Sequence, residues 1–243
     1  MEKLFAMGVH ADAVPDWLLS SWVRSCLAAG ATASPDVIRA AGQGLLDRWD
    51  APDRKYHNIT HLIDVLSRVD ELSEETHEPD LVRLAAWYHG AKFSASEAAA
   101  YASRGGEDEE ESAELALSEL AELGVPERER SRVAELVRAL LRHTAAPHDF
   151  DCAVLCDADL SMLAAEPQRY STYLAELREE YAHIPVRDYV TSRIAILTRL
   201  RQREHLFASG TGAAWEESAR QNLDAELARL TKELAALDQA ADD

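Results

Sequence analysis

Apolar residues recur at helical spacing along nearly the whole chain. In 17–29 they stand three to five positions apart, and comparable spacing returns in 62–72, 81–93 and 133–141. Such a period places apolar side chains on one face of an α-helix, whereas a half-buried strand would alternate them with polar ones. No segment alternates convincingly, and no repeat of fixed length is found. The pattern therefore predicts an all-α fold, with 1–243 forming one domain of about nine or ten helices.

Capping residues, prolines and glycines indicate where these helices begin and end. Ser34 caps a helix that opens with proline and runs to about Trp49, and Asn58 or Thr60 caps the next one. The segment 81–93 is apolar almost all round, which is typical of a helix in the centre of a bundle. Further helices are expected at 107–124, 126–141, 152–164, 167–183, 186–203 and 214–237, with a loop at 99–106 and a frayed tail at 238–243.

The charge balance excludes several classes of partner. The chain has 25 basic and 44 acidic residues, and its net charge of −19 repels nucleic acid and anionic membrane surfaces. An anionic substrate would therefore need local positive charge, from a metal or a few arginines. The chain has only three cysteines, Cys26, Cys152 and Cys156. This odd number and their wide spacing argue against a disulfide framework and favour a reducing cytoplasm. Neither a signal peptide nor a run of 18 apolar residues is apparent, so no membrane segment is expected.

Histidines and carboxylates supply the candidate chemistry. His57 and His61 stand four residues apart at the start of an apolar helix, so both imidazoles lie on one face, one turn apart. His89 ends the most hydrophobic helix. Asp157 and Asp159 lie in an apolar segment, where a carboxylate needs a metal, an arginine or hydrogen bonds. The remaining candidates are the acidic run 107–111, His143 and His148. Each residue alone is more often structural, but as a set in helical context they favour a site.

Several short motifs also follow one another in a characteristic order. They are Arg54-Lys55-Tyr56-His57-Asn58 with His61, Ala85-Ala86-Trp87-Tyr88-His89, Asp108-Glu109-Glu110-Glu111-Ser112-Ala113, Thr144 with His148, Asp157-Ala158-Asp159-Leu160, Arg178-Glu179-Glu180-Tyr181, Arg193, and Ala219-Arg220-Gln221-Asn222-Leu223. This order resembles the HD superfamily, and its closest counterpart is the bacterial branch of predicted metal-dependent HD phosphohydrolases. The first motif is also similar to the opening signature of cyclic nucleotide phosphodiesterases. Each motif alone is weak, but the resemblance covers almost the whole chain.

The resemblance implies an HD-domain-like helical bundle that carries a metal centre. His61, His89 and Asp159 would be the metal ligands, and the cofactor would be a divalent transition metal: Mn, Fe, Co, Ni or Zn. Such an ion would polarise a phosphoryl oxygen and lower the pKa of its water. The implied activity is hydrolysis of a phosphorylated small molecule or nucleotide. Nucleic acid and membranes are not expected as partners, and a homodimer stays open.

Catalytic and substrate-binding roles follow from the same resemblance. His57 would donate a proton to the leaving oxygen, with Tyr56 beside it as a further catalytic candidate. Glu109 or Glu110 would orient the attacking water. The expected substrate contacts are Arg54, Lys92 and His148. His148 could instead serve a second metal.

Position 90 departs from the family pattern. Gly90 follows His89 where relatives have an aspartate that normally ligates the metal. Three ligands remain, enough for a mononuclear site, although the ammonium of Lys92 could compete with a metal. Two hypotheses therefore stand: a metal-dependent hydrolase with a weakened centre, or an HD-fold protein that has lost phosphohydrolase activity and works without a metal. The latter would be an acid–base enzyme of specialised metabolism or a small-molecule binding protein, and gain of metal binding in Gly90→Asp would discriminate between them.

Overall fold

The computed structural model describes residues 15–101 and 106–242. Within these ranges the chain is helical almost throughout, and the all-α fold is confirmed. The α-helices are α1 (Asp16–Ala28), α2 (Pro35–Trp49), α3 (Ile59–Glu71), α4 (Pro79–Tyr88), α5 (Glu97–Tyr101), α6 (Glu109–Glu122), α7 (Glu127–Ala139), α8 (Phe150–Leu160), α9 (Pro167–Glu180), α10 (Val186–Arg201) and α11 (Glu216–Asp242). The shorter elements are the 3₁₀ helices η1 (Ser73–Glu75), η2 (Ser161–Ala164) and η3 (Gly212–Trp215), and the antiparallel strands β1 (Phe93–Ser94) and β2 (Gly106–Glu107).

Side-chain caps begin four of these helices. The Ser34 hydroxyl accepts a backbone N–H at the start of α2, and Asp108 and Asp149 cap α6 and α8 in the same way. At α3 the cap is Asn58, whose Oδ1 accepts the N–H of Thr60 at 2.8 Å. These contacts satisfy amide groups that a helix start leaves without partners. The expected start of α2 is confirmed, and Asn58 is the residue that caps α3.

The helix expected over 81–93 ends earlier than its apolar pattern suggests. Helix α4 stops at Tyr88, and the chain turns through Gly90 into β1. Phe93 belongs to this strand. Its ring packs against the His57 ring and the Arg54 guanidinium and not in the central core. The expected loop over 99–106 also differs, because 97–101 form α5; residues 102–105 lie outside the described ranges. An apolar run therefore shows burial correctly here but not the end of the helix.

Helix α11 continues to Asp242, so residues 238–242 of the expected frayed tail lie within a helix. Leu234 packs against the C-terminal core, and Asp238 lies 2.6 Å from the guanidinium of Arg187 at the start of α10. These contacts join α11 to the C-terminal core and to α10 as far as Asp238. Asp243 lies outside the described residues.

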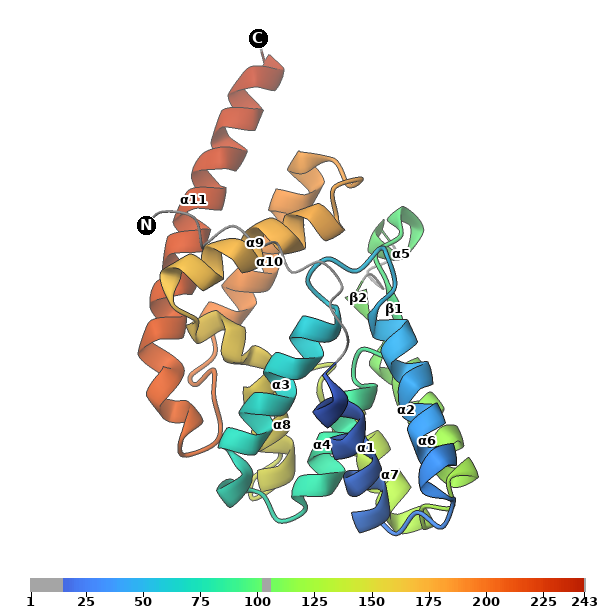
Figure 1. Ribbon diagram of the computed structural model, residues 1–243. Coiled ribbons are helices and arrows are strands. Elements are labelled where there is room, and N and C mark those ends of the chain that lie inside the picture. Colours follow the sequence, from blue (N-terminus) through green and yellow to red (C-terminus); the bar gives the residue numbers. More distant parts are fainter. Residues whose placement is uncertain (1–14, 102–105, 243) are drawn as a thin grey trace, which may run out of the picture.

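Helix α4 is the centre of the larger part of the bundle. It contacts α1, α3, α6, α7 and α8, which surround it (Figure 1). Seven of its residues between Leu81 and Tyr88 are buried. The central position predicted for this apolar segment is therefore confirmed.

A second apolar cluster joins α9, α10 and α11, which lie together to one side (Figure 1). Tyr56, from the loop before α3, belongs to this cluster, whereas Leu62 of α3 belongs to the first one. Trp215 packs against both clusters. The segment around Tyr56 and His61 therefore lies at the border between the two clusters.

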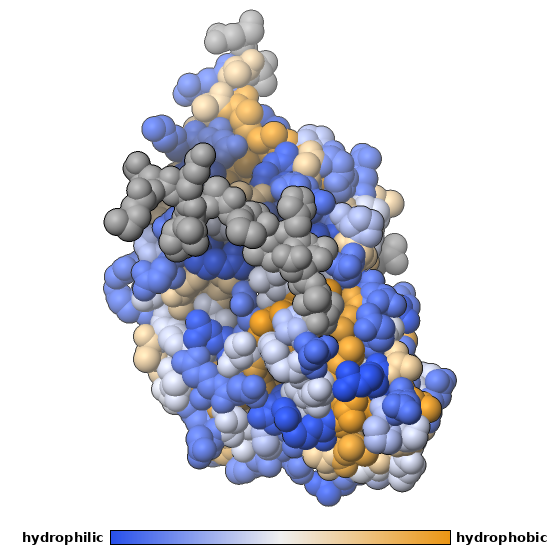
Figure 2. Space-filling model, in the orientation of Figure 1, coloured by the Kyte–Doolittle hydropathy of each residue, from blue (hydrophilic) through white to orange (hydrophobic). Residues whose placement is uncertain are grey.

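Hydrophilic residues cover most of the described part of the face in Figure 2, and apolar residues appear there as narrow strips. Within residues 15–101 and 106–242, no helix combines the length and the apolar character that crossing a membrane requires.

Candidate metal centre

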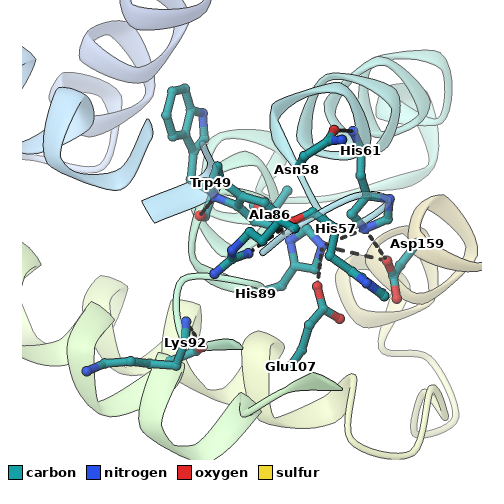
Figure 3. A network of polar contacts seen from close by, with 12 residues as sticks. Trp49, His57, Asn58, His61, Ala86, His89, Lys92, Glu107 and Asp159 are labelled. Atoms are coloured by element: carbon teal, nitrogen blue, oxygen red, sulfur yellow. Dashed lines mark hydrogen bonds and ion pairs between the residues drawn. The ribbon is translucent and has the colours of Figure 1, made fainter. Parts of the chain in front are cut away.

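Four side chains from different elements bring their ligand atoms together beside α4 (Figure 3). His61 lies in the first turn of α3, His89 directly follows α4, Glu107 is in β2, and Asp159 is near the end of α8. Nε2 of His61 lies 3.2 Å from Nε2 of His89 and 3.3 Å from Oδ1 of Asp159. Nε2 of His89 lies 3.5 Å from Oε1 of Glu107 and 3.6 Å from Oδ1 of Asp159. The sequence-predicted ligands are thus brought together, with one further carboxylate.

His89 presents a lone pair to this cluster. The side chain is fully buried, and its Nδ1 lies 2.6 Å from the carbonyl oxygen of Ala86. A carbonyl only accepts, so Nδ1 carries the hydrogen and Nε2 of the neutral ring carries none. Burial lowers the pKa of His89 to about 4, which keeps the ring neutral at pH 7. A neutral imidazole fixed by a carbonyl at its other nitrogen is the usual form of a histidine metal ligand.

Glu107 reaches the place that a side chain at position 90 would enter. A Cβ atom on Gly90 would stand 2.7 Å from Oε1 of Glu107 and 2.2 Å from the ring of Trp49. Oε1 of Glu107 is buried and has no hydrogen-bond partner among the described residues. Burial raises the pKa of Glu107 to about 8. At this pKa the group largely keeps its proton at neutral pH. An oxygen of Glu107 that has no donor among the described residues and faces an imidazole lone pair therefore fits a cation that would take the place of that proton.

Asp159 turns its two oxygens to different neighbours. Oδ1 faces His61 and His89, while Oδ2 lies 2.6 Å from Nε2 of His143. Burial alone would raise the pKa of Asp159, but its contacts with His143 and the neighbouring His61 and His89 hold it well below its usual range. Asp159 is therefore an anion at neutral pH, with Oδ1 available to a metal.

The donor set and its spacing fit a divalent transition metal. Ligand atoms about 2.1 Å from a tetrahedral metal stand about 3.4 Å from one another. Four of the six separations in this set, those that involve His61 or His89 as given above, lie between 3.2 and 3.6 Å. The ligand atoms of His61, His89 and Glu107 all lie within 4.8 Å of one another. Two imidazoles with carboxylates suit Zn, Fe, Mn, Co and Ni better than Ca or Mg. The residues present are thus a suitable ligand set for the metal that the motif order implies.

His57 lies beside this cluster and is held by Glu180 from α9. Oε1 of Glu180 lies 2.6 Å from Nδ1 of His57, and Oε2 accepts the backbone N–H groups of Lys55, Tyr56 and His57 at 2.9–3.1 Å. Burial alone would raise the pKa of Glu180, but the hydrogen bonds from His57 and the backbone lower it. The ionised carboxylate therefore fixes the hydrogen on Nδ1. The His57 side chain is 17% exposed, so part of the ring reaches the surface.

Arg54 brings positive charge to the same region. Its guanidinium carbon lies 4.7 Å from the ring centre of Phe93 and 5.1 Å from that of Trp49, and Nη1 donates to the carbonyl of His57 at 3.1 Å. Burial lowers the pKa of Arg54, and the carboxylate of Glu107 acts in the opposite direction. The group is thus a guanidinium held between aromatic rings close to the candidate metal ligands.

Tyr56 is buried between His61 and Tyr173, with ring-centre separations of 4.9 and 4.6 Å. Burial raises its pKa well above the ordinary value, so the phenol is neutral at physiological pH. In this position the Tyr56 ring packs against the His61 ring and limits where it can lie.

The other sequence-predicted site residues are dispersed. Glu109 is half-buried, and burial raises its pKa. The charges of His143 and Asp159 also act on this pKa, so Glu109 lies close to the cluster. Glu110 pairs with Arg138 at 2.9 Å on the surface. Lys92 extends away from the cluster (Figure 3). His148 is exposed, and its ring centre lies 6.4 Å from that of Phe150.

Asp157 lies on the other side of α8 from the cluster. Its oxygens accept the backbone N–H groups of Ala208 at 2.8 Å and Ser209 at 2.7 Å. Both aspartates of this apolar segment thus have the partners that burial demands. Asp157 anchors a loop, whereas Asp159, the aspartate that the resemblance gives as a metal ligand, belongs to the candidate centre.

Three important residues received no individual role from the sequence. Glu107 was one member of an acidic run, His143 one of two neighbouring histidines, and Glu180 part of a matched motif. The position of Glu107 directly before the capping Asp108 was the one available signal, since it places Glu107 outside the helix. Contacts across long sequence separations identified the other two.

An open surface cleft of about 500 Å³ lies elsewhere, lined mainly by residues of α7, with His77 and Glu78 from the segment before α4. Its charged groups neutralise one another: Arg128 pairs with Glu78, and Arg132 pairs with Asp149 and Asp151. The cleft therefore adds no group that suggests chemistry.

Comparison with family models, curated proteins and solved structures gives no match. The chemistry of the cluster itself is therefore the basis for assigning a function.

Proposed function

We propose that the protein is a metal-dependent hydrolase of a phosphorylated small molecule or nucleotide, of the HD-superfamily type that its motif order resembles. The main support is the convergence of His61, His89 and Glu107, with Asp159 3.3 Å from His61. A buried oxygen of Glu107 also has no donor among the described residues. The proposal includes the cytoplasmic location expected from the sequence, and it includes no nucleic-acid or membrane partner.

The protein's own groups suit phosphoester hydrolysis. A divalent metal held by this cluster would supply the Lewis-acid chemistry for attack of water on phosphorus. Arg54 attracts the anionic phosphoryl group, and half-buried Glu109 orients the water. His57, aligned by Glu180 through Nδ1, uses Nε2 to transfer a proton to the leaving oxygen. Proton transfer by such a positioned group typically contributes about 10²–10⁴-fold to the rate.

Metal analysis of the purified chain tests this proposal. Elemental analysis and calorimetric titration with Mn²⁺, Fe²⁺, Co²⁺, Ni²⁺ and Zn²⁺ are expected to give one bound ion per chain. Release of product from p-nitrophenyl phosphate and bis(p-nitrophenyl) phosphate then measures turnover. Glu107→Gln is expected to lower metal affinity by at least roughly tenfold. The exposed Glu111→Gln, in the same acidic run, should leave affinity unchanged. No binding of any of the five ions, together with no turnover, would overturn the proposal.

A metal-free acid–base enzyme is the second candidate, because the His57–Glu180 pair is complete without a metal. It predicts turnover that is insensitive to chelator and to Glu107→Gln but lost in His57→Gln. Turnover that stops on chelation and returns with added metal would exclude it. A small-molecule binding protein would be stabilised by its ligand and would show no turnover, with or without added metal.

A further inference from the structure

His143 adopts a backbone conformation that residues other than glycine rarely take. Its φ angle is +45°, in the left-handed region, at the end of the turn that follows α7. Its N–H donates to the carbonyl of Leu140 at 3.2 Å. A side-chain-bearing residue remains in this region only where its surroundings hold it there.

Arg203 holds this turn through two main-chain contacts. Nη1 donates to the carbonyl of His143 at 2.9 Å, and Nη2 donates to the carbonyl of Arg142 at 2.6 Å. Arg203 follows α10 and is itself fixed, because its own carbonyl accepts from Arg220 of α11 at 2.9 Å. The planar guanidinium spans consecutive carbonyls, a two-point contact that a lysine ammonium cannot reproduce in the same geometry.

The strained turn directs the His143 ring to Asp159. A carboxylate only accepts, so Nε2 of His143 carries the hydrogen that it donates to Oδ2 of Asp159 over 2.6 Å. This bond fixes the plane of the carboxylate and leaves Oδ1 facing His61 at 3.3 Å. Rotation of the carboxylate would move Oδ1 away from the other ligands.

We propose that Arg203 is a positioning residue of the metal centre. It holds His143 in the left-handed conformation, and His143 in turn orients Asp159 for metal binding. This inference rests on the proposed function, because it assumes that the cluster binds a metal. A purely structural Arg203 would instead fasten the end of α10 and affect only the stability of the whole chain.

Co²⁺ titration of the full chain, followed by calorimetry and by visible absorbance, tests this chain of contacts. Arg203→Met is expected to weaken Co²⁺ binding by roughly 10–100-fold, as loss of an outer-shell partner typically does, and to change the visible spectrum. His143→Gly adopts a positive φ freely but lacks the imidazole, so it should give a similar loss. The double variant should bind no more weakly than His143→Gly. Arg203→Lys should recover only part of the affinity.

Arg201→Met is the matched control. Arg201 ends α10 and pairs on the surface with Asp224 of α11, without contact to the turn at His143. Its Co²⁺ affinity and spectrum should equal those of the unmodified chain. Circular dichroism verifies folding, and Arg203→Lys replaces Arg203→Met under the same criteria if the methionine variant does not fold.

Two results would overturn the inference alone: Arg203→Met matching Arg201→Met in affinity, or losses that add in the double variant. An unmodified chain that binds no Co²⁺ and none of the other four ions would overturn the proposed function and this inference with it. The two failures are therefore distinguishable.

Discussion

Oε1 of Glu107 lies 2.7 Å from the point where a side chain on residue 90 would begin, and Gly90 leaves that space free. A carboxylate from the strand after α5 thus approaches His89 from the position where an adjacent aspartate would stand. The absence of a side chain at position 90 and the presence of Glu107 are two parts of one arrangement. The sequence suggested that Gly90→Asp would restore a lost ligand, and the geometry predicts otherwise.

Gly90→Ala and Gly90→Asp should both destabilise the chain. The added Cβ would meet the Trp49 ring at 2.2 Å, and such overpacking costs about 1–3 kcal/mol. Gly90→Asp should also fail to raise metal affinity, because its carboxylate would displace that of Glu107. Urea unfolding and Co²⁺ titration measure both effects. Gly44→Ala is the control: at this helical site no described atom lies within 4 Å of the added Cβ, so the variant should stabilise the folded chain by about 0.5–1 kcal/mol. Tighter metal binding in Gly90→Asp would contradict this account.

Metal binding should raise the melting temperature. At a free metal concentration of 100 times Kd, linkage stabilises the folded state by about 2.7 kcal/mol, which corresponds to about 5–10 °C for a chain of this size. His61→Ala should abolish this increase because it removes a ligand atom. His205→Ala, whose side chain is 74% exposed, should retain it. An equal rise in both variants would place the metal elsewhere.

Glu180 should make the stability of the folded chain fall as the pH becomes acidic. Its pKa lies below the ordinary 4.5 in the folded chain, so its stabilising contribution is fully present above that value. The contribution is lost as pH falls through the lowered pKa. Glu180→Gln should therefore cost about 1–3 kcal/mol at pH 7 and flatten the fall in melting temperature between about pH 5 and pH 3. The exposed neighbour Glu179→Gln should leave the pH profile unchanged, and equal profiles for the two variants would refute this role.

Arg193 and Glu226 form a buried ion pair inside the C-terminal cluster. Nε of Arg193 lies 2.8 Å from Oε1 of Glu226, whose other oxygen accepts from Tyr170 at 2.6 Å. Arg193→Met would leave the carboxylate buried without its cation and should cost about 3–5 kcal/mol. Adding Glu226→Leu should recover most of that loss in urea unfolding. Arg229→Met, which breaks the exposed pair with Glu233, should change stability by no more than about 0.5 kcal/mol.

Local sequence signals were sufficient for most of the fold. Ser34 and Asn58 mark the starts of α2 and α3 because capping depends on neighbouring residues alone. The apolar segment beginning at Leu81 predicted the central helix for the same reason. Its end could not be predicted, because Phe93 leaves the core to pack beside Arg54, a contact between distant parts of the chain.

The candidate centre divides in the same way. His61, His89 and Asp159 stand in recognisable motifs, and the structure brings them together. Glu107 carries no such signal, since its value depends on the space left by Gly90 and Trp49. Partners that orient a ligand can lie anywhere in the sequence, as Glu180 does for His57 across 123 positions.

The last candidate ligand, Asp159, lies near the end of α8, well before the end of the chain. All four candidate ligands lie between residues 61 and 159, so a fragment ending at Leu160 would contain every one of them. It would lack Glu180, which aligns His57, and the amides of Ala208 and Ser209 that fix Asp157 on the same helix as Asp159. Glu180, Ala208 and Ser209 are thus encoded in the last third of the sequence, after every candidate ligand. The smallest functional unit is therefore set by the supports and extends well beyond the last ligand.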